Sequence, residues 1–126
     1  MSDIPVSYTD VAVSISQLSR ELRQAASDHA SIRHKASRAK EAYILAHAKV
    51  YLAVSTELDD NGKPLLAAVR DAKANLATSD ERLAAALADD EVAAHTTYIH
   101  SLRTRIDAAR SGGTLLRAEI EIDKIR

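Results

Sequence analysis

Residues 11–53 read VAVSISQLSRELRQAASDHASIRHKASRAKEAYILAHAKVYLA, with apolar or small side chains at alternating intervals of four and three residues. About six heptads of such a repeat are typical of a coiled coil. The sequence therefore predicts one long amphipathic helix over residues 9–56 in an all-α protein. Histidine is the only polar residue among the repeating positions, which are Val11, Ile15, Leu18, Leu22, Ala25, His29, Ile32, Ala36, Ala39, Tyr43, Ala46, Val50 and Ala53.

Signals that begin a helix lie just before this repeat. Residues 1–8 form a short lead that contains Pro5. Ser7 and Asp10 have the spacing of a capping box, with aspartate in place of the usual glutamate. The first helix is therefore expected to begin near Thr9.

The strongest break in the chain lies in residues 57–63. Asn61-Gly62 favours a backbone with positive φ, and Pro64 suits the first turn of a helix. We therefore expect the chain to reverse over residues 57–63 and to continue as a second long helix over residues 64–110. Its apolar positions are less regularly spaced: Leu65, Val69, Ala72, Leu76, Leu83, Leu87, Ala94, Tyr98, Leu102, Ile106 and Ala109.

The continuity of this second helix is open to two interpretations. Ser79 and Asp80 interrupt the apolar positions. A kink or a new helix capped near Thr78 is therefore the alternative to one continuous helix, which is the interpretation we favour.

The C-terminal residues are expected to form a separate element. Gly112-Gly113 predicts the end of the second helix, because glycine favours helix ends. Apolar spacing predicts a short third helix over residues 114–126. Ile120 and Ile122 alternate with acidic residues, so a strand is the less favoured alternative.

An antiparallel hairpin centred on the predicted turn brings opposite charges together. Arg33, Lys35 and Arg38 of the first helix would lie across from the acidic stretch Asp89-Asp90-Glu91 of the second. Each exposed ion pair contributes only about 0.3 kcal/mol. The match nevertheless supports the hairpin independently of the turn residues.

A two-helix hairpin leaves the apolar side chains on its flanks uncovered. Self-association into a four-helix or larger bundle would cover them, so we expect a homo-oligomer, a dimer or higher. The flanking residues are Ile44, Leu45, Leu66, Ile99 and Leu116. The seam of the oligomeric helical bundle is expected to contain Ile15, Leu18, Leu22, His29, Ile32, Tyr43 and Val50.

The composition limits the size of the core and the class of protein. The 126 residues fit one helical domain, and without Trp or Phe they favour narrow helix seams over a large core. No cysteine is present, and the net charge of −1 implies no particular partner. Residues 1–6 lack the runs of an export signal, and no apolar segment is long enough to cross a membrane, so we expect a cytoplasmic protein.

Histidines are the only plausible metal ligands or neutral-pH bases in the sequence. The hairpin register would bring His29 close to His95, and such a pair would suit a metal or a response to pH. The favoured interpretation is a polar residue that fixes the register of the seam. We therefore expect no metal and no other cofactor.

An enzyme is not expected. The acidic pairs at residues 59–60 and 89–90 are predicted to lie in a polar loop and on a helix surface, where they would be solvated. The sequence contains no phosphate-binding glycine loop, nucleophile elbow or dinucleotide fingerprint.

Positive charge is concentrated in residues 14–40 and 98–117, which contain ten basic and three acidic residues. A hairpin would bring these segments to the same half of the molecule. There the basic residues could bind the phosphates of a nucleic acid without contacts specific to its bases. The favoured alternative is that the acids at residues 89–91 pair with several of these cations and that the others are solvated. Candidate contacts to nucleic acid or a partner are Arg20, Arg23, Arg33, Lys35, Arg38, Lys40, Tyr98, Arg103, Arg105 and Arg110.

Four segments of residues 35–120 carry a resemblance to known proteins: Ala42-Tyr43 to Tyr51-Leu52-Ala53, Ala67 to Leu87, Leu102-Arg103-Thr104-Arg105-Ile106 and Leu116-Arg117-Ala118-Glu119. In these segments the chain resembles small coiled-coil proteins encoded by tailed bacteriophages, often beside recombination or replication genes. The resemblance implies an accessory protein that works in the bacterial cytoplasm with DNA-processing enzymes.

The expected function is that of a non-enzymatic, oligomeric coiled-coil protein that acts through protein contacts, as a phage accessory factor in DNA metabolism or host takeover. The alternative is direct, sequence-nonspecific binding of nucleic acid through the basic residues. A third interpretation is a structural component of the virion.

Overall fold

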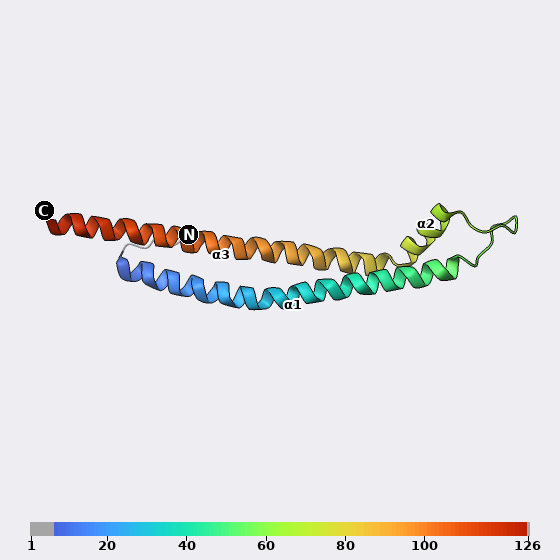
Figure 1. Ribbon diagram of the computed structural model, residues 1–126, viewed down its shortest axis with the longest axis horizontal. Coiled ribbons are helices and arrows are strands. Elements are labelled where there is room, and N and C mark those ends of the chain that lie inside the picture. The colour runs from blue at the N-terminus through green and yellow to red at the C-terminus, as the bar shows by residue number, and fades with distance from the viewer. Residues whose placement is uncertain (1–6, 126) are drawn as a thin grey trace. The chain divides into compact units, whose positions relative to one another are not determined.

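The computed structural model describes residues 7–125, with side chains to residue 124, as three helices: α1 (Tyr8–Val54), α2 (Ala67–Ala77) and α3 (Ser79–Ile125) (Figure 1). No strand occurs among these residues, so the predicted all-α class is confirmed. The chain divides into two compact units. Unit 1 consists of Met1–His29 and Ala94–Arg126, and unit 2 consists of Ala30–Ala93.

The Ser7 half of the predicted capping box forms at the N-terminus of α1. The backbone N–H of Asp10 donates to Ser7 Oγ at 3.1 Å, and α1 begins at Tyr8. At the other end, the hydroxyls of Ser55 and Thr56 donate to the carbonyls of residues 52 and 53. These hydroxyls satisfy two carbonyls of the last turn, and α1 ends at Val54, two residues before the predicted end.

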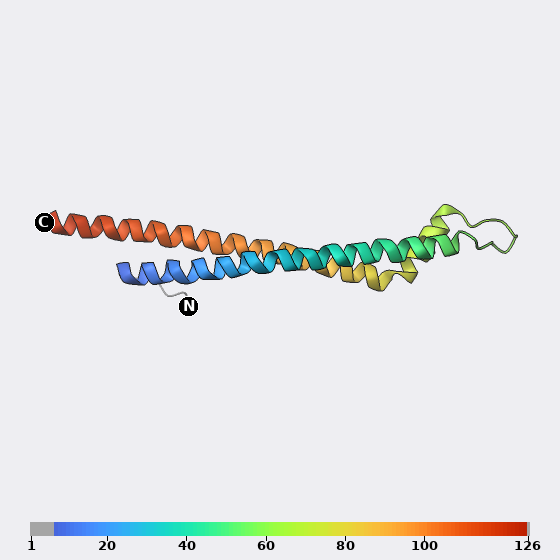
Figure 2. The same cartoon turned by 60° about the horizontal axis from the view of Figure 1, so that its bottom comes forward.

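In unit 1, α1 packs against α3, and both views show these segments side by side (Figure 1 and Figure 2). Val11, Ala25, Leu102 and Ile106 are buried between the two helices. The shielded positions of α3 follow the same alternation of four and three residues as α1. They are His95, Ile99, Leu102, Ile106, Ala109, Gly113 and Leu116.

In unit 2, the second half of α1 packs against the first part of α3. The positions of α1 that the four-and-three repeat predicts are shielded up to Val50. The last predicted position, Ala53, is exposed, and its neighbour Val54 is buried instead. The shielded residues of α3 here are Glu81, Ala85, Ala88 and Val92, and after the glutamate in the first turn they are small or short. Small side chains let two helices approach closely.

The favoured continuous second helix is wrong, and the alternative of a break near Thr78 is confirmed, because the chain changes direction at Thr78, between α2 and α3. The Thr78 side chain is only 1% exposed, and its hydroxyl donates to the carbonyl of Ala74 at 2.7 Å. Thr78 is the C-cap of α2, with a non-helical φ of −112° and ψ of 23°. Ser79 then starts α3 with two acidic residues in its first turn, where the helix dipole favours negative charge.

The turn between α1 and α2 lies where the sequence predicts it, but the second helix does not begin at Pro64. Asp59 accepts hydrogen bonds on its carboxylate from the backbone of Asn61 and Lys63, and Gly62 has a φ of 75°. Pro64 instead forms an isolated antiparallel bridge with Leu58. Helix α2 therefore begins only at residue 67.

The predicted break at Gly112-Gly113 and the short third helix over residues 114–126 are also wrong, since α3 is helical through Ile125. Gly113 is buried, and a Cβ atom built on it would lie 2.9 Å from Val11 Cγ1. Glycine therefore allows α1 to approach α3 closely at this position. Packing against α1 is compatible with an α3 that stays helical through both glycines. The same continuity excludes the strand considered for Ile120 and Ile122.

The buried stripe of α3 differs from the predicted one before residue 102. Leu83, Leu87 and Tyr98 were expected on the apolar stripe but are exposed, whereas Ile99, expected on a flank, is half-buried. Large leucines keep helix axes further apart than alanines do, so the close contact in unit 2 forms through alanines and leaves the leucines outside. No described helix combines the length and apolar character needed to cross a membrane.

Candidate functional site

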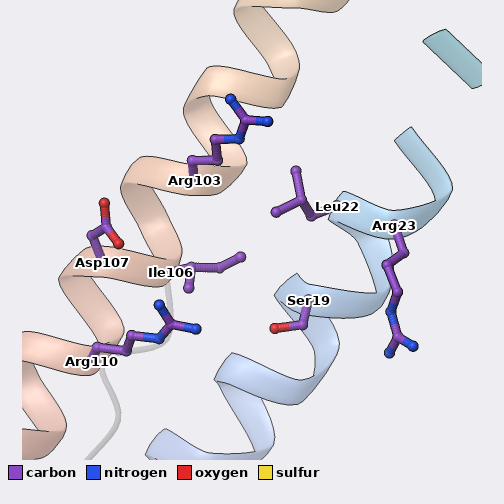
Figure 3. A pocket seen from close by; sticks show the side chains of 7 residues that line it. All are labelled: Ser19, Leu22, Arg23, Arg103, Ile106, Asp107 and Arg110. Atoms are coloured by element: carbon purple, nitrogen blue, oxygen red, sulfur yellow. The ribbon is translucent and has the colours of Figure 1, made fainter. Parts of the chain in front are cut away.

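An open groove in unit 1 has an apolar floor and three arginines in its lining, and we call it the arginine groove. Arg103 and Arg110 lie on α3, whereas the guanidinium of Arg23 points away from α3 (Figure 3). The volume of the groove is about 320 Å³, and Figure 3 shows Leu22 of α1 and Ile106 of α3 facing each other within it. Arg110 extends from α3 toward Ser19 of α1. The full lining consists of Ser19, Leu22, Arg23, Arg103, Ile106, Asp107 and Arg110.

Helical periodicity explains why these arginines share the groove. Arg103 and Arg110 are seven residues apart, so they lie on the same flank of α3. The facing flank of α1 carries Ser19, with Ala12 and Ala26 seven residues to either side. Because these side chains are small and uncharged, the flank of α1 leaves space and offers no carboxylate to the arginines.

The charge in the arginine groove is not neutralised within the described chain. Asp107 is the one carboxylate in its lining, and it forms no ion pair with Arg23, Arg103 or Arg110 among residues 7–125. All three arginines are exposed. Their guanidinium groups are therefore free to bind an anion that enters from solvent.

The other predicted basic residues are distributed differently. Arg20 and Arg105 belong to unit 1 and are exposed, but they do not line the groove. Arg38 is exposed in unit 2. Tyr98 is 44% exposed in unit 1, where its ring and the His95 ring are 6.0 Å apart between centroids and inclined by 62°.

In unit 2 the basic residues meet acidic ones. Lys35 Nζ lies 3.4 Å from Glu91 Oε2. Arg33 and Lys40 line a hollow of about 220 Å³ together with Asp89. The predicted match between the first helix and the acidic stretch at 89–91 is therefore confirmed for Lys35 and Glu91, while Arg33 and Lys40 share a hollow with Asp89 without forming an ion pair to it among the described residues.

His29 and His95 meet between α1 and α3 in unit 1, as the hairpin register predicts. Their Nδ1 atoms are 3.0 Å apart, the distance of an N–H···N hydrogen bond. The ring centroids are 5.2 Å apart with planes 15° from parallel, so the imidazoles meet edge to edge with the two nitrogens between them. One histidine must donate the proton and the other must accept it.

A metal at this pair would have few protein ligands. Among the described residues, no group of three His, Cys, Asp or Glu side chains is placed to hold a metal ion. His29 and His95 would thus supply two ligands alone, whereas structural zinc sites use four. The geometry fits a hydrogen bond that sets the register of the two helices.

The residues predicted for an oligomer seam lie in the interior of the two units. Ile15, Leu18, Leu22 and His29 are half-buried in unit 1, and Ile32, Tyr43 and Val50 are half-buried in unit 2. A different set of apolar side chains remains exposed in unit 2. It consists of Ile44, Leu45, Leu52, Leu58, Leu66, Val69, Leu76, Leu83 and Leu87, which we call the exposed apolar set.

Sequence reasoning missed two features of these surfaces. It placed Leu76, Leu83 and Leu87 on the buried stripe, although they are 79%, 59% and 59% exposed. It also assigned all the basic residues to one surface, although only Arg23, Arg103 and Arg110 line the groove. The seven-residue spacing of Arg103, Arg110 and Arg117 was the signal for a shared flank. Comparisons with protein-family models, curated proteins and solved structures find no match to this chain.

Proposed function

We propose that this chain is a non-enzymatic, self-associating coiled-coil protein that acts through protein contacts. The observation that carries the proposal is the exposed apolar set of unit 2. Leu83 and Leu87 form an exposed apolar face on α3, and Leu45 and Leu52 form another on α1. Exposed apolar faces of this kind mark sites of association. Burying one leucine side chain stabilises an interface by about 1.5–3 kcal/mol.

The placement of the leucines supports helix-to-helix contact. Leu83 and Leu87 are four residues apart on α3, so they lie on one face, and that face points away from the half-buried Ala85 and Ala88. Leu45 and Leu52 are seven residues apart on α1, so they also share one face, which points away from the shielded residues of that helix. Outer faces of this kind pack against further helices in bundles. A second copy of the chain is the simplest source of such helices.

The setting that we propose follows the resemblance to phage coiled-coil proteins. The chain would act as an accessory factor in phage DNA metabolism or in takeover of the host, in the bacterial cytoplasm. The long uninterrupted α1, with shielded residues at alternating intervals of four and three, supports the coiled-coil part of this proposal.

Sedimentation velocity at micromolar concentration tests the proposal. We expect the wild-type protein to sediment as a dimer or larger assembly, and the variant L83Q/L87Q to shift toward monomer because the apolar face is lost. The matched control is Ala86→Gln, which adds the same side chain at an exposed position of the same helix without removing a leucine. A wild-type protein that stays monomeric would contradict the proposal.

A further inference from the structure

We propose that the arginine groove of unit 1 binds the phosphate backbone of a single nucleic-acid strand. This activity goes beyond the protein contacts proposed above, which rest on the exposed apolar set of unit 2. The two surfaces contain different residues, so each proposal can fail without the other.

The type of basic residue in unit 1 favours phosphate recognition. Of the eight basic residues in the sequence of unit 1, seven are arginine, and the one lysine, Lys124, lies outside residues 14–29 and 98–117. The guanidinium group presents a rigid fork of donors that matches two phosphate oxygens, whereas the lysine ammonium acts as a point charge. In unit 2, by contrast, lysine supplies five of the nine basic residues of Ala30–Ala93.

The spacing of the arginines suits a strand that runs along the groove. Arg103, Arg110 and Arg117 recur every seven residues, which places successive side chains about 10.5 Å apart along the helix axis. Arg103 and Arg110 line the groove, while Arg117 donates to the Tyr8 hydroxyl at 2.6 Å. A phenol does not neutralise a guanidinium, so this flank carries a row of three positive charges.

The remaining lining residues fit the other parts of a strand. The Ser19 hydroxyl is placed to donate a hydrogen bond to a phosphate oxygen, and Figure 3 shows it on the side of α1 that faces Arg110. Leu22 and Ile106 form an apolar floor against which sugars and base edges can pack. The single carboxylate, Asp107, is outnumbered by the three arginines.

The row of charges favours a nucleic-acid strand over an acidic protein helix. A strand carries a phosphate on every nucleotide, so it can meet Arg103, Arg110 and Arg117 in turn, and the guanidinium fork matches two oxygens of each phosphate. The hollow of unit 2 is a weaker candidate, because Asp89 opposes Arg33 and Lys40 in its lining.

Fluorescence anisotropy with a labelled oligothymidine of about 15 nucleotides, titrated from about 20 to about 200 mM salt, tests this proposal. We expect the wild-type protein to bind at low salt and to lose affinity steeply as salt rises. The variant R103Q/R110Q should bind about tenfold more weakly, and its log–log salt slope should fall by about 1.4, since each phosphate contact to a single strand contributes about 0.7.

The matched control is R20Q/R105Q, which removes two exposed arginines of the same unit that lie outside the groove. It has the same net charge as R103Q/R110Q, and we expect its salt slope to equal that of the wild type. Circular dichroism confirms that both variants keep their helix content, since glutamine and arginine have similar helix propensities.

Four results would overturn the proposal. The first is absence of binding by the wild-type protein at low salt, and the second is an equal loss in the two double variants, which would show bulk charge alone. The third is tighter binding of a duplex of the same length. The fourth is displacement of the oligonucleotide by poly-glutamate at lower concentration than by unlabelled oligothymidine, which would assign the groove to an acidic protein.

Discussion

At the scale of single residues, His29 and His95 form the most specific polar contact between helices. Their Nδ1 atoms are 3.0 Å apart, and both side chains are half-buried at positions where the other shielded residues are mostly apolar. A polar pair at such a position is satisfied only in one alignment of the two helices. The pair therefore opposes sliding of α1 along α3 in unit 1.

A double-mutant cycle tests the strength of this contact. We expect His29→Leu and His95→Leu each to lower the free energy of unfolding, because each leaves one imidazole without its partner. The double variant should lose less than the sum of the two, with a coupling energy of about 1 kcal/mol in urea denaturation. The control cycle pairs His29 with the exposed His100, and we expect no coupling there. A coupling near zero for His29 and His95 would show that the contact does not set the register.

At the scale of elements, the continuity of α3 depends on a contact with α1. Gly112 and Gly113 lie inside α3, although glycine is unfavourable in a helix by about 1 kcal/mol relative to alanine. A Cβ on Gly112 would meet nothing within 4 Å, whereas a Cβ on Gly113 would lie 2.9 Å from Val11 Cγ1. The two adjacent glycines therefore have different roles.

Alanine substitutions separate these roles. We expect Gly112→Ala to raise the free energy of unfolding by about 0.5–1 kcal/mol, because alanine is the better helix former. Gly113→Ala should give no gain or a loss, because Val11 is β-branched and stiff at χ1 and must move away from the new methyl group. Thermal unfolding followed by circular dichroism measures both. Equal gains at the two positions would show that α1 does not approach α3 closely at Gly113.

At the scale of the whole molecule, the two units divide the proposed roles. Unit 2 carries the exposed apolar set, and unit 1 carries the arginine groove. The shielded seams themselves consist largely of alanine and medium-sized aliphatic residues, so each residue of the seam buries little apolar area. Association of copies would therefore supply a substantial share of the stability.

Mass action gives this idea a measurable consequence. If folding is linked to self-association, the midpoint of thermal unfolding rises with protein concentration. We expect the Tm of the wild-type protein to increase over a range from about 1 to about 100 μM, and the Tm of L83Q/L87Q to vary less. Differential scanning calorimetry measures the shift. A wild-type Tm that is independent of concentration would show that the monomer is stable by itself.

Local signals in the sequence predicted the start of α1, its four-and-three repeat and the position of the turn. Ser7 caps the helix, and Gly62 adopts the positive φ that Asn61-Gly62 favours. The repeat identified the shielded residues of α1 up to Val50. These features depend on one helix or one turn at a time, so periodicity and backbone preference were sufficient to predict them.

The sequence by itself thus determined the helical class, the long first helix and the reversal of the chain. Only the tertiary structure decided which stripe of α3 is buried, where α2 ends and which arginines share a groove. Two apolar stripes compete on α3, and the one with Ala85 and Ala88 faces α1 because small side chains permit closer packing than Leu83 and Leu87 do. That choice depends on the neighbouring helix, which local patterns do not describe.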